Sequence, residues 1–151
     1  MLTDSHNPTS SKPHFLEYDE TRFPLVLVRP RGRATDADLD GLLVALKRPL
    51  LRREKYVEIF DATHTDPGTS TQRRRIAEWM RAHANLISTY SVGTVIVVPS
   101  ALVRGALTAI FWIQPMPCPH AVASTMAEAE RWAEEKLRAE GIAMPPKQTR
   151  F

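Results

Sequence analysis

The chain has 151 residues, of which 43% are hydrophobic and 25% charged, the balance of an ordinary globular protein. This length suits one domain with a buried core. The longest apolar segment, Ala101–Ile113, is shorter than the roughly 18 residues that a membrane-spanning helix needs, and the polar N-terminus lacks the features of a secretory signal. The single cysteine, Cys118, excludes an internal disulfide and a cysteine-based zinc site. We therefore expect a cytoplasmic protein.

The net charge of +3 is a mild basic excess. Basic residues occur in short groups, but acidic residues are interleaved through most of the chain, as on a solvated surface. The sequence contains no RRM, zinc-finger or KH signature, so nucleic acid is not an expected partner.

The pattern predicts a disordered N-terminal tail over residues 1–13, a single α/β domain over residues 14–142 and a flexible C-terminal tail over residues 143–151. The domain opens with a short edge strand, residues 14–18, and a buried strand, residues 25–28. Thr35 then caps a helix with one apolar face, which Pro49 ends or kinks.

The second half of the domain alternates strands with helices. The strand Tyr56–Asp61 and a polar segment precede a helix whose apolar side runs from Ile76 to Ile87. The strand 92–98 leads directly into Ala101–Ile113, which is predicted to be a buried helix. A proline-rich connection and a short strand then precede a final helix, where Thr125 and Glu128 form a capping box.

This order predicts an α/β fold: a mixed, mostly parallel sheet of about five strands, opened by an antiparallel hairpin, with about four helices. The carboxyl ends of its parallel strands are the usual place for a ligand. Asp61, His64 and Asp66 lie at such an end, where they could hold a divalent cation or simply shape a polar loop.

A second candidate site lies at the start of the next helix. Ser70, Arg73 and Arg74 could bind an anion there, because free amides and the helix dipole attract negative charge. The same residues also fit a helix cap followed by a solvated face, since helical spacing sends the arginines to different sides.

No convergent catalytic set is present. Prolines flank Cys118, and no partner for a catalytic triad is identifiable, so a structural thiol is expected. Ser100 lacks a nucleophile elbow, and no P-loop or G-x-G-x-x-G motif occurs. We therefore expect a protein that is not an enzyme and that needs no cofactor or metal.

The helix Ala101–Ile113 is apolar on almost all sides and must be covered by something. A subunit interface, a partner groove or an apolar ligand pocket would supply that cover, as would plain core packing. The candidate interaction residues are Leu107, Ile110, Phe111 and Trp112.

These elements together resemble the STAS-like superfamily, in its SpoIIAA-like branch of anti-sigma-factor antagonists. The matching parts are the opening hairpin, the strand Tyr56–Asp61 with its terminal aspartate, the strand 92–98 and the Glu-Ala-Glu-Arg-Trp-Ala stretch of residues 128–133. Members of that branch carry a phosphorylatable serine after the aspartate, in an Asp-Ser-x-Gly context. Here Ala62 and Thr63 follow Asp61 without a glycine, so the resemblance implies no such switch unless Thr63, Thr69 or Ser70 replaces the serine.

The resemblance implies a regulatory module that binds a partner protein or a small apolar ligand. Our first hypothesis is a non-enzymatic protein-interaction module in bacterial signalling that forms a homodimer or docks a partner protein through the helix Ala101–Ile113. The alternative is an apolar-ligand or lipid carrier that uses the same helix as a pocket wall. A weaker alternative is a metal-dependent enzyme at Asp61, His64 and Asp66.

Overall fold

The computed structural model describes residues 14–146, in which strands and helices alternate. Its strands and helices follow one another as β1 (Leu16–Asp19), β2 (Leu25–Gly32), α1 (Asp36–Leu51), β3 (Tyr56–Asp61), β4 (His64–Thr65), α2 (Ser70–Ala82), α3 (Ala84–Tyr90), β5 (Ser91–Val97), α4 (Ala101–Ile113), β6 (His120–Ala123) and α5 (Met126–Ala139).

The strands form one mixed sheet in the order β1-β2-β3-β5-β6. β1 and β2 make the antiparallel hairpin, and every other neighbouring pair along this path is parallel. The two-residue β4 pairs with the end of β2, beside the main path. The mixed, mostly parallel sheet expected from the sequence is therefore confirmed, with β4 as an addition inside the predicted polar segment.

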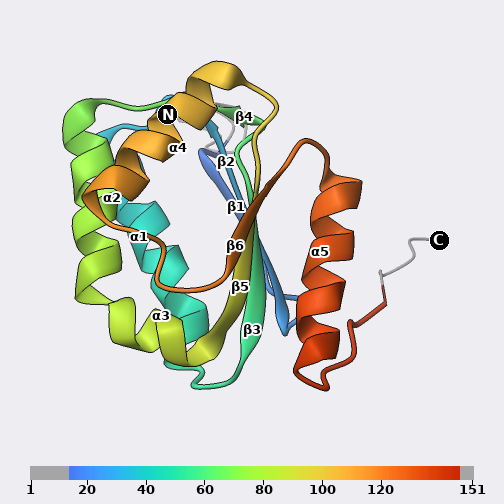
Figure 1. Ribbon diagram of the computed structural model, residues 1–151. Helices are drawn as coiled ribbons and strands as arrows, with labels where there is room; N and C mark the ends of the chain where they lie inside the picture. The colour runs from blue at the N-terminus through green and yellow to red at the C-terminus, as the bar shows by residue number, and fades with distance from the viewer. Residues whose placement is uncertain (1–13, 147–151) are drawn as a thin grey trace, which may run out of the picture.

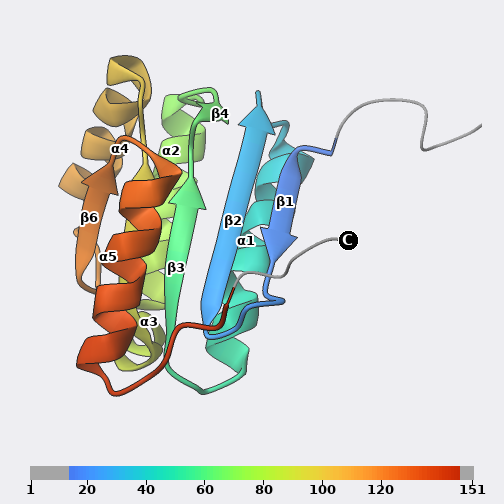
Figure 2. The ribbon, with the colours of Figure 1, turned by 90° about the vertical axis from the view of Figure 1, so that its right-hand side faces the viewer.

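Helices cover the sheet unequally. α1, α2, α3 and α4 lie on one face, whereas α5 lies alone on the other (Figure 1). A quarter turn of the molecule shows α5 in front of the sheet and the other helices behind it (Figure 2). Because side chains alternate along a strand, Val57 and Ile59 of β3 join the core beside α5, while Tyr56 and Phe60 join the core beneath the four-helix layer.

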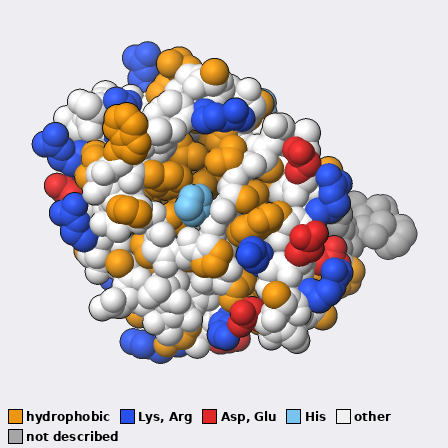
Figure 3. Space-filling model, viewed as in Figure 1, with side chains coloured by type: hydrophobic (Ala, Val, Ile, Leu, Met, Phe, Trp, Pro, Cys, Tyr) orange, Lys and Arg blue, Asp and Glu red, His pale blue; other side chains and the backbone are white. Residues whose placement is uncertain are grey.

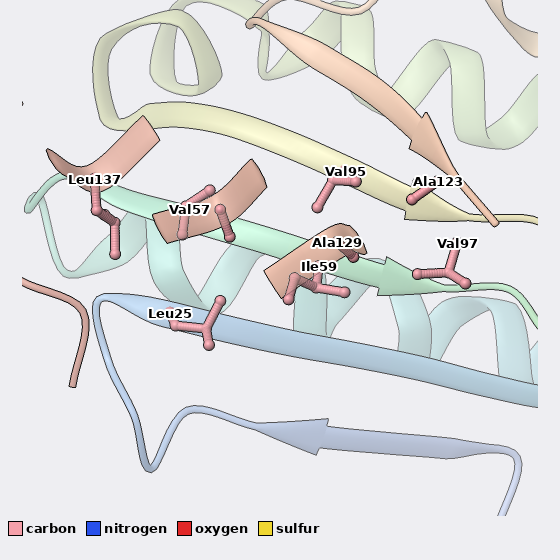
Figure 4. Packing of buried hydrophobic residues seen from close by; sticks show 9 residues of the cluster. Leu25, Val57, Ile59, Val95, Val97, Ala123, Ala129 and Leu137 are labelled. Atoms are coloured by element: carbon pink, nitrogen blue, oxygen red, sulfur yellow. The ribbon is translucent and has the colours of Figure 1, made fainter. Parts of the chain in front are cut away.

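The core beside α5 is tightly packed. Strand side chains such as Val57, Ile59 and Val95 gather around Ala129 and Leu137 of α5 (Figure 4). Ala129, Ala133 and Leu137 have no exposed surface, as the periodicity of this helix predicts.

Side-chain caps set the helix starts. Thr35 and Asp38 form a reciprocal capping box at α1, and Thr69 forms one with Gln72 at α2. At α5 the Thr125 hydroxyl accepts from the Glu128 amide as predicted. The Glu128 carboxylate, however, accepts from the amide of Ser124 instead of completing the box at Thr125.

Two helix predictions need correction. The single helix expected through Ile87 is split at His83, which ends α2 and precedes α3. The expected burial of the helix Ala101–Ile113 is also wrong: Ile110 is the one fully buried residue of α4, and Leu102 and Trp112 are 71% and 85% exposed. α4 packs against α2 at the margin of the helix layer, and within residues 14–146 no element covers its outer side.

The predicted N-terminal tail, residues 1–13, lies outside the described residues, as do residues 147–151 of the predicted C-terminal tail. The described start of that second tail lies against the domain: Met144 packs on the core beside α5, and the Arg22 guanidinium donates to the Pro145 carbonyl at 3.1 Å. Within residues 14–146, no helix is long and apolar enough to span a membrane.

Candidate functional site

A cavity of about 180 Å³ lies between the sheet and the four-helix layer. Its floor comes from β3 and β5, with Phe60 and Ile96 among the floor residues. α1, α2 and α4 supply its walls, including Leu42, Trp79 and Leu107. The cavity exists because α2 and α4 pack against each other above the sheet and leave space beneath them.

The lining of the cavity is predominantly apolar and unusually aromatic. Aliphatic side chains such as Leu39, Ile76, Met80 and Ile110 make up much of the wall. Five aromatic side chains also face the space: Phe15, Tyr56, Phe60, Trp79 and Phe111. Such a lining suits a compact hydrophobic molecule, for which a few polar groups fix the orientation.

The polar groups of the floor centre on Glu58. This residue lies in the middle of β3, on the same face as Tyr56 and Phe60, and only 8% of its surface is exposed. Burial raises the pKa of its carboxyl to about 7. Ser91 and Thr94 of β5 line the cavity as well, and the hydroxyls of both interact with the buried Cys118 thiol. Within residues 14–146, the Glu58 carboxyl therefore offers hydrogen-bonding capacity that no other residue uses.

Cys118 lies next to this floor but is not arranged as a nucleophile. Its thiol is 3.6 Å from the Thr94 hydroxyl. Burial raises the pKa of the thiol, so the reactive thiolate is disfavoured. This environment fits the structural role expected from the flanking prolines.

Asp61 is held by its own neighbours at the carboxyl end of β3. Arg29 donates through Nε to the carboxylate at 2.8 Å, and the Thr63 amide donates at 3.0 Å. The Thr63 hydroxyl donates to the same carboxylate. Burial alone would raise the pKa of Asp61, but the hydrogen bonds from Thr63 and Arg29 outweigh it and lower the pKa below its usual range. These contacts fix the turn after the strand.

The other residues of the predicted loop site do not converge on Asp61. His64 is exposed in β4, and Asp66 faces Arg33 at 3.7 Å. Among residues 14–146, no group of three or more His, Cys, Asp or Glu side chains could hold a metal ion.

The residues of the candidate anion site, Ser70, Arg73 and Arg74, likewise do not converge. Thr69, not Ser70, caps α2, and its hydroxyl accepts from the Gln72 amide. Arg73 turns back to donate to the Gly68 carbonyl at 2.6 Å, whereas Arg74 and Ser70 are exposed.

The search of solved structures finds a similar fold. A protein of the DUF3478 family from Shewanella loihica PV-4, described as uncharacterised and as having a SpoIIAA-like fold, superposes with a TM-score of 0.59. The two sequences are 15% identical, and the match covers 82% of this chain and 97% of the other. This chain has a SpoIIAA-like fold. No family model and no curated protein matches the sequence.

In this SpoIIAA-like domain, the four predicted interaction residues of α4 divide between two surfaces. Leu107, Ile110 and Phe111 line the cavity. Trp112 points away from it and is almost fully exposed. The sequence grouped them because all four are apolar, but only their positions around the helix separate an inner wall from an outer surface.

The outer surface of α4 continues onto the last strand of the sheet. Hydrophobic side chains gather on this side of the molecule, around a hollow between α4 and β6 (Figure 3). We define the apolar patch as the exposed large hydrophobic residues of these two elements: Leu102, Trp112, Ile113 and Val122.

Glu58 was not among the residues predicted for the site. A signal for it was present, since it is the one charged residue inside the otherwise apolar run from Tyr56 to Phe60. Alternation along a strand would have placed it on the same face as those two aromatic residues. For the cavity in front of it, the sequence offered one signal, the apolar helix Ala101–Ile113 as the wall of a ligand pocket.

Proposed function

We propose that this SpoIIAA-like domain is a non-enzymatic module that binds a small apolar molecule in the cavity beneath α2 and α4. The observation that carries the proposal is the cavity itself, with about 180 Å³ of space and a mostly apolar lining. An apolar cavity of roughly 150 Å³ is enough to bind benzene. The space therefore suits a single ring or a short aliphatic group better than a long lipid chain.

A titration with toluene, followed by calorimetry, tests this function. Ala106 of α4 lines the cavity, so Ala106→Leu should fill part of it and weaken toluene binding by about tenfold or more. Ala101→Leu, at the exposed start of the same helix, is the matched control and should bind like the wild type. Native mass spectrometry of protein purified from cells should also reveal a bound small molecule. A wild-type chain that binds no toluene would contradict the proposal.

A second candidate function is docking of a protein partner at the apolar patch, as expected of a regulatory module in bacterial signalling. Its support is the exposure of Trp112, 85%, and of Leu102, 71%, because a large exposed aromatic group is a common anchor in protein interfaces. The SpoIIAA-like fold is compatible with both functions.

A further inference from the structure

The Glu58 carboxyl faces the cavity without a partner among the residues that the structure describes. Its neighbours in β3, Val57 and Ile59, pack on the opposite side of the sheet, so alternation directs Glu58 toward the cavity, where it forms part of the lining. The side chain makes no hydrogen bond or ion pair with any other residue in the range 14–146. More than nine-tenths of the residue is buried.

A buried carboxylate of this kind is costly unless a cation or a hydrogen-bond donor reaches it. The chain places one cationic side chain on the lining within the described residues, that of Arg73. Its guanidinium already donates to the carbonyls of Pro67 and Gly68, at the start of α2. Within residues 14–146 no counter-ion thus reaches Glu58, and burial raises the pKa of its carboxyl to about 7.

The walls around the carboxyl favour a cation as the missing partner. Phe15, Tyr56, Phe60, Trp79 and Phe111 all line the same cavity. The faces of aromatic rings attract ammonium groups, and an aromatic cage with a carboxylate is an effective receptor for them. An anionic ligand would instead meet Glu58 with the same sign of charge.

We propose that the cavity binds a small organic amine, whose ammonium group is received by Glu58 while its apolar part lies among the aromatic side chains. This inference rests on the proposed function and specifies the chemistry of the ligand. A cavity volume of about 180 Å³ suits single-ring or short aliphatic amines. The Ser91 hydroxyl also lines the cavity and interacts with the Cys118 thiol, so its oxygen can still accept a second N–H from the same group.

Three probes of nearly equal size test the inference by calorimetric titration at about pH 8, where benzylamine is protonated. The probes are benzylamine, benzyl alcohol and toluene. We expect benzylamine to bind the wild type at least about tenfold more tightly than benzyl alcohol or toluene, since hydrogen bonds to a charged group are the strong ones. Glu58→Gln should remove this preference and keep toluene binding. Glu54→Gln, an exposed acid with the same charge change, should leave it intact.

The outcomes separate the two proposals. If toluene binds but benzylamine binds no better, or if Glu58→Gln keeps the preference, the ammonium site is wrong and the apolar cavity function stands. A stronger affinity for benzyl alcohol than for benzylamine would identify a neutral hydroxyl ligand and overturn the amine. If no probe binds the wild type, the proposed function fails together with the inference. Thermal melting of each variant confirms that it is folded.

Discussion

At the scale of single residues, two acidic side chains of β3 show how the environment decides the role of a carboxyl group. Asp61 ends the strand and receives hydrogen bonds from Arg29 and Thr63, so it stays ionised and shapes the turn. Glu58, three residues earlier, is enclosed by the cavity walls and has no partner in the described chain. A carboxylate that is fully hydrogen-bonded at a strand end has a structural role. A buried carboxyl group without a partner in a cavity instead indicates a ligand.

The isolation of Glu58 predicts a pH dependence of stability. Burial raises the pKa of its carboxyl from 4.5 to about 7 in the folded protein. Below pH 4.5 this group is protonated in both states and has no cost. As the pH rises toward 7, the Glu58 carboxyl ionises first in the unfolded state. The free energy of unfolding therefore falls by on the order of 3 kcal/mol.

Glu58→Gln should therefore be more stable than the wild type near pH 8 and about equally stable near pH 4. Urea unfolding at a series of pH values measures the difference, and Glu54→Gln provides the control with an exposed acid. A difference between Glu58→Gln and the wild type that does not change with pH would contradict the isolation of this carboxyl.

At the scale of the elements, α5 and β5 are joined by a close contact that requires a glycine. A Cβ atom at Gly93 would lie 2.6 Å from the Trp132 ring and 3.3 Å from the Pro119 carbonyl oxygen. The Trp132 ring occupies the space where a side chain would stand, and Lys136 lies over that ring at 5.2 Å from its centroid. This contact sets how closely the single helix approaches its face of the sheet.

Gly93→Ala should lower the free energy of unfolding by about 1–3 kcal/mol, the usual cost of overpacking a core. Trp132→Leu creates space at the same place, so the double variant should lose less than the sum of the two single variants. Chemical denaturation of the four proteins measures this coupling. Strictly additive losses would show that the ring does not constrain residue 93.

At the scale of the whole molecule, four helices cover one face of the sheet and α5 alone covers the other. At the margin of the larger layer, α4 has two roles. One side of α4 closes the cavity, and the other side carries Trp112 into solvent. The apolar patch also includes Val122 of β6, the last strand of the described sheet, so it reaches an edge that another chain could approach.

If the apolar patch joins two copies of the chain, the wild type should sediment as a homodimer and Trp112→Asp as a monomer of unchanged melting temperature. The thermal stability should persist because an exposed residue contributes little to folding. Leu51→Asp, at another exposed apolar residue (63%) far from the patch on α1, is the control and should remain dimeric. A wild type that stays monomeric at high concentration would leave the patch to a different partner or to none.

The sequence by itself determined the elements and their order in this protein. The buried strands, the caps at Thr35 and Thr125 and the periodicity of α5 are local properties of the chain, and alternation of strands with helices restricts the topology. The resemblance to the SpoIIAA-like branch rested on the same features, and the SpoIIAA-like fold that it implied is confirmed.

Only the tertiary structure decided where these elements leave space. The break at His83, the exposure of α4 and the cavity depend on how the helices pack over the sheet, which residues neighbouring in sequence do not encode. The same reason explains why the lack of a partner for Glu58 among the described residues could not be predicted from the sequence. Its direction follows from strand alternation, but whether a partner meets a buried carboxyl depends on side chains brought from distant segments.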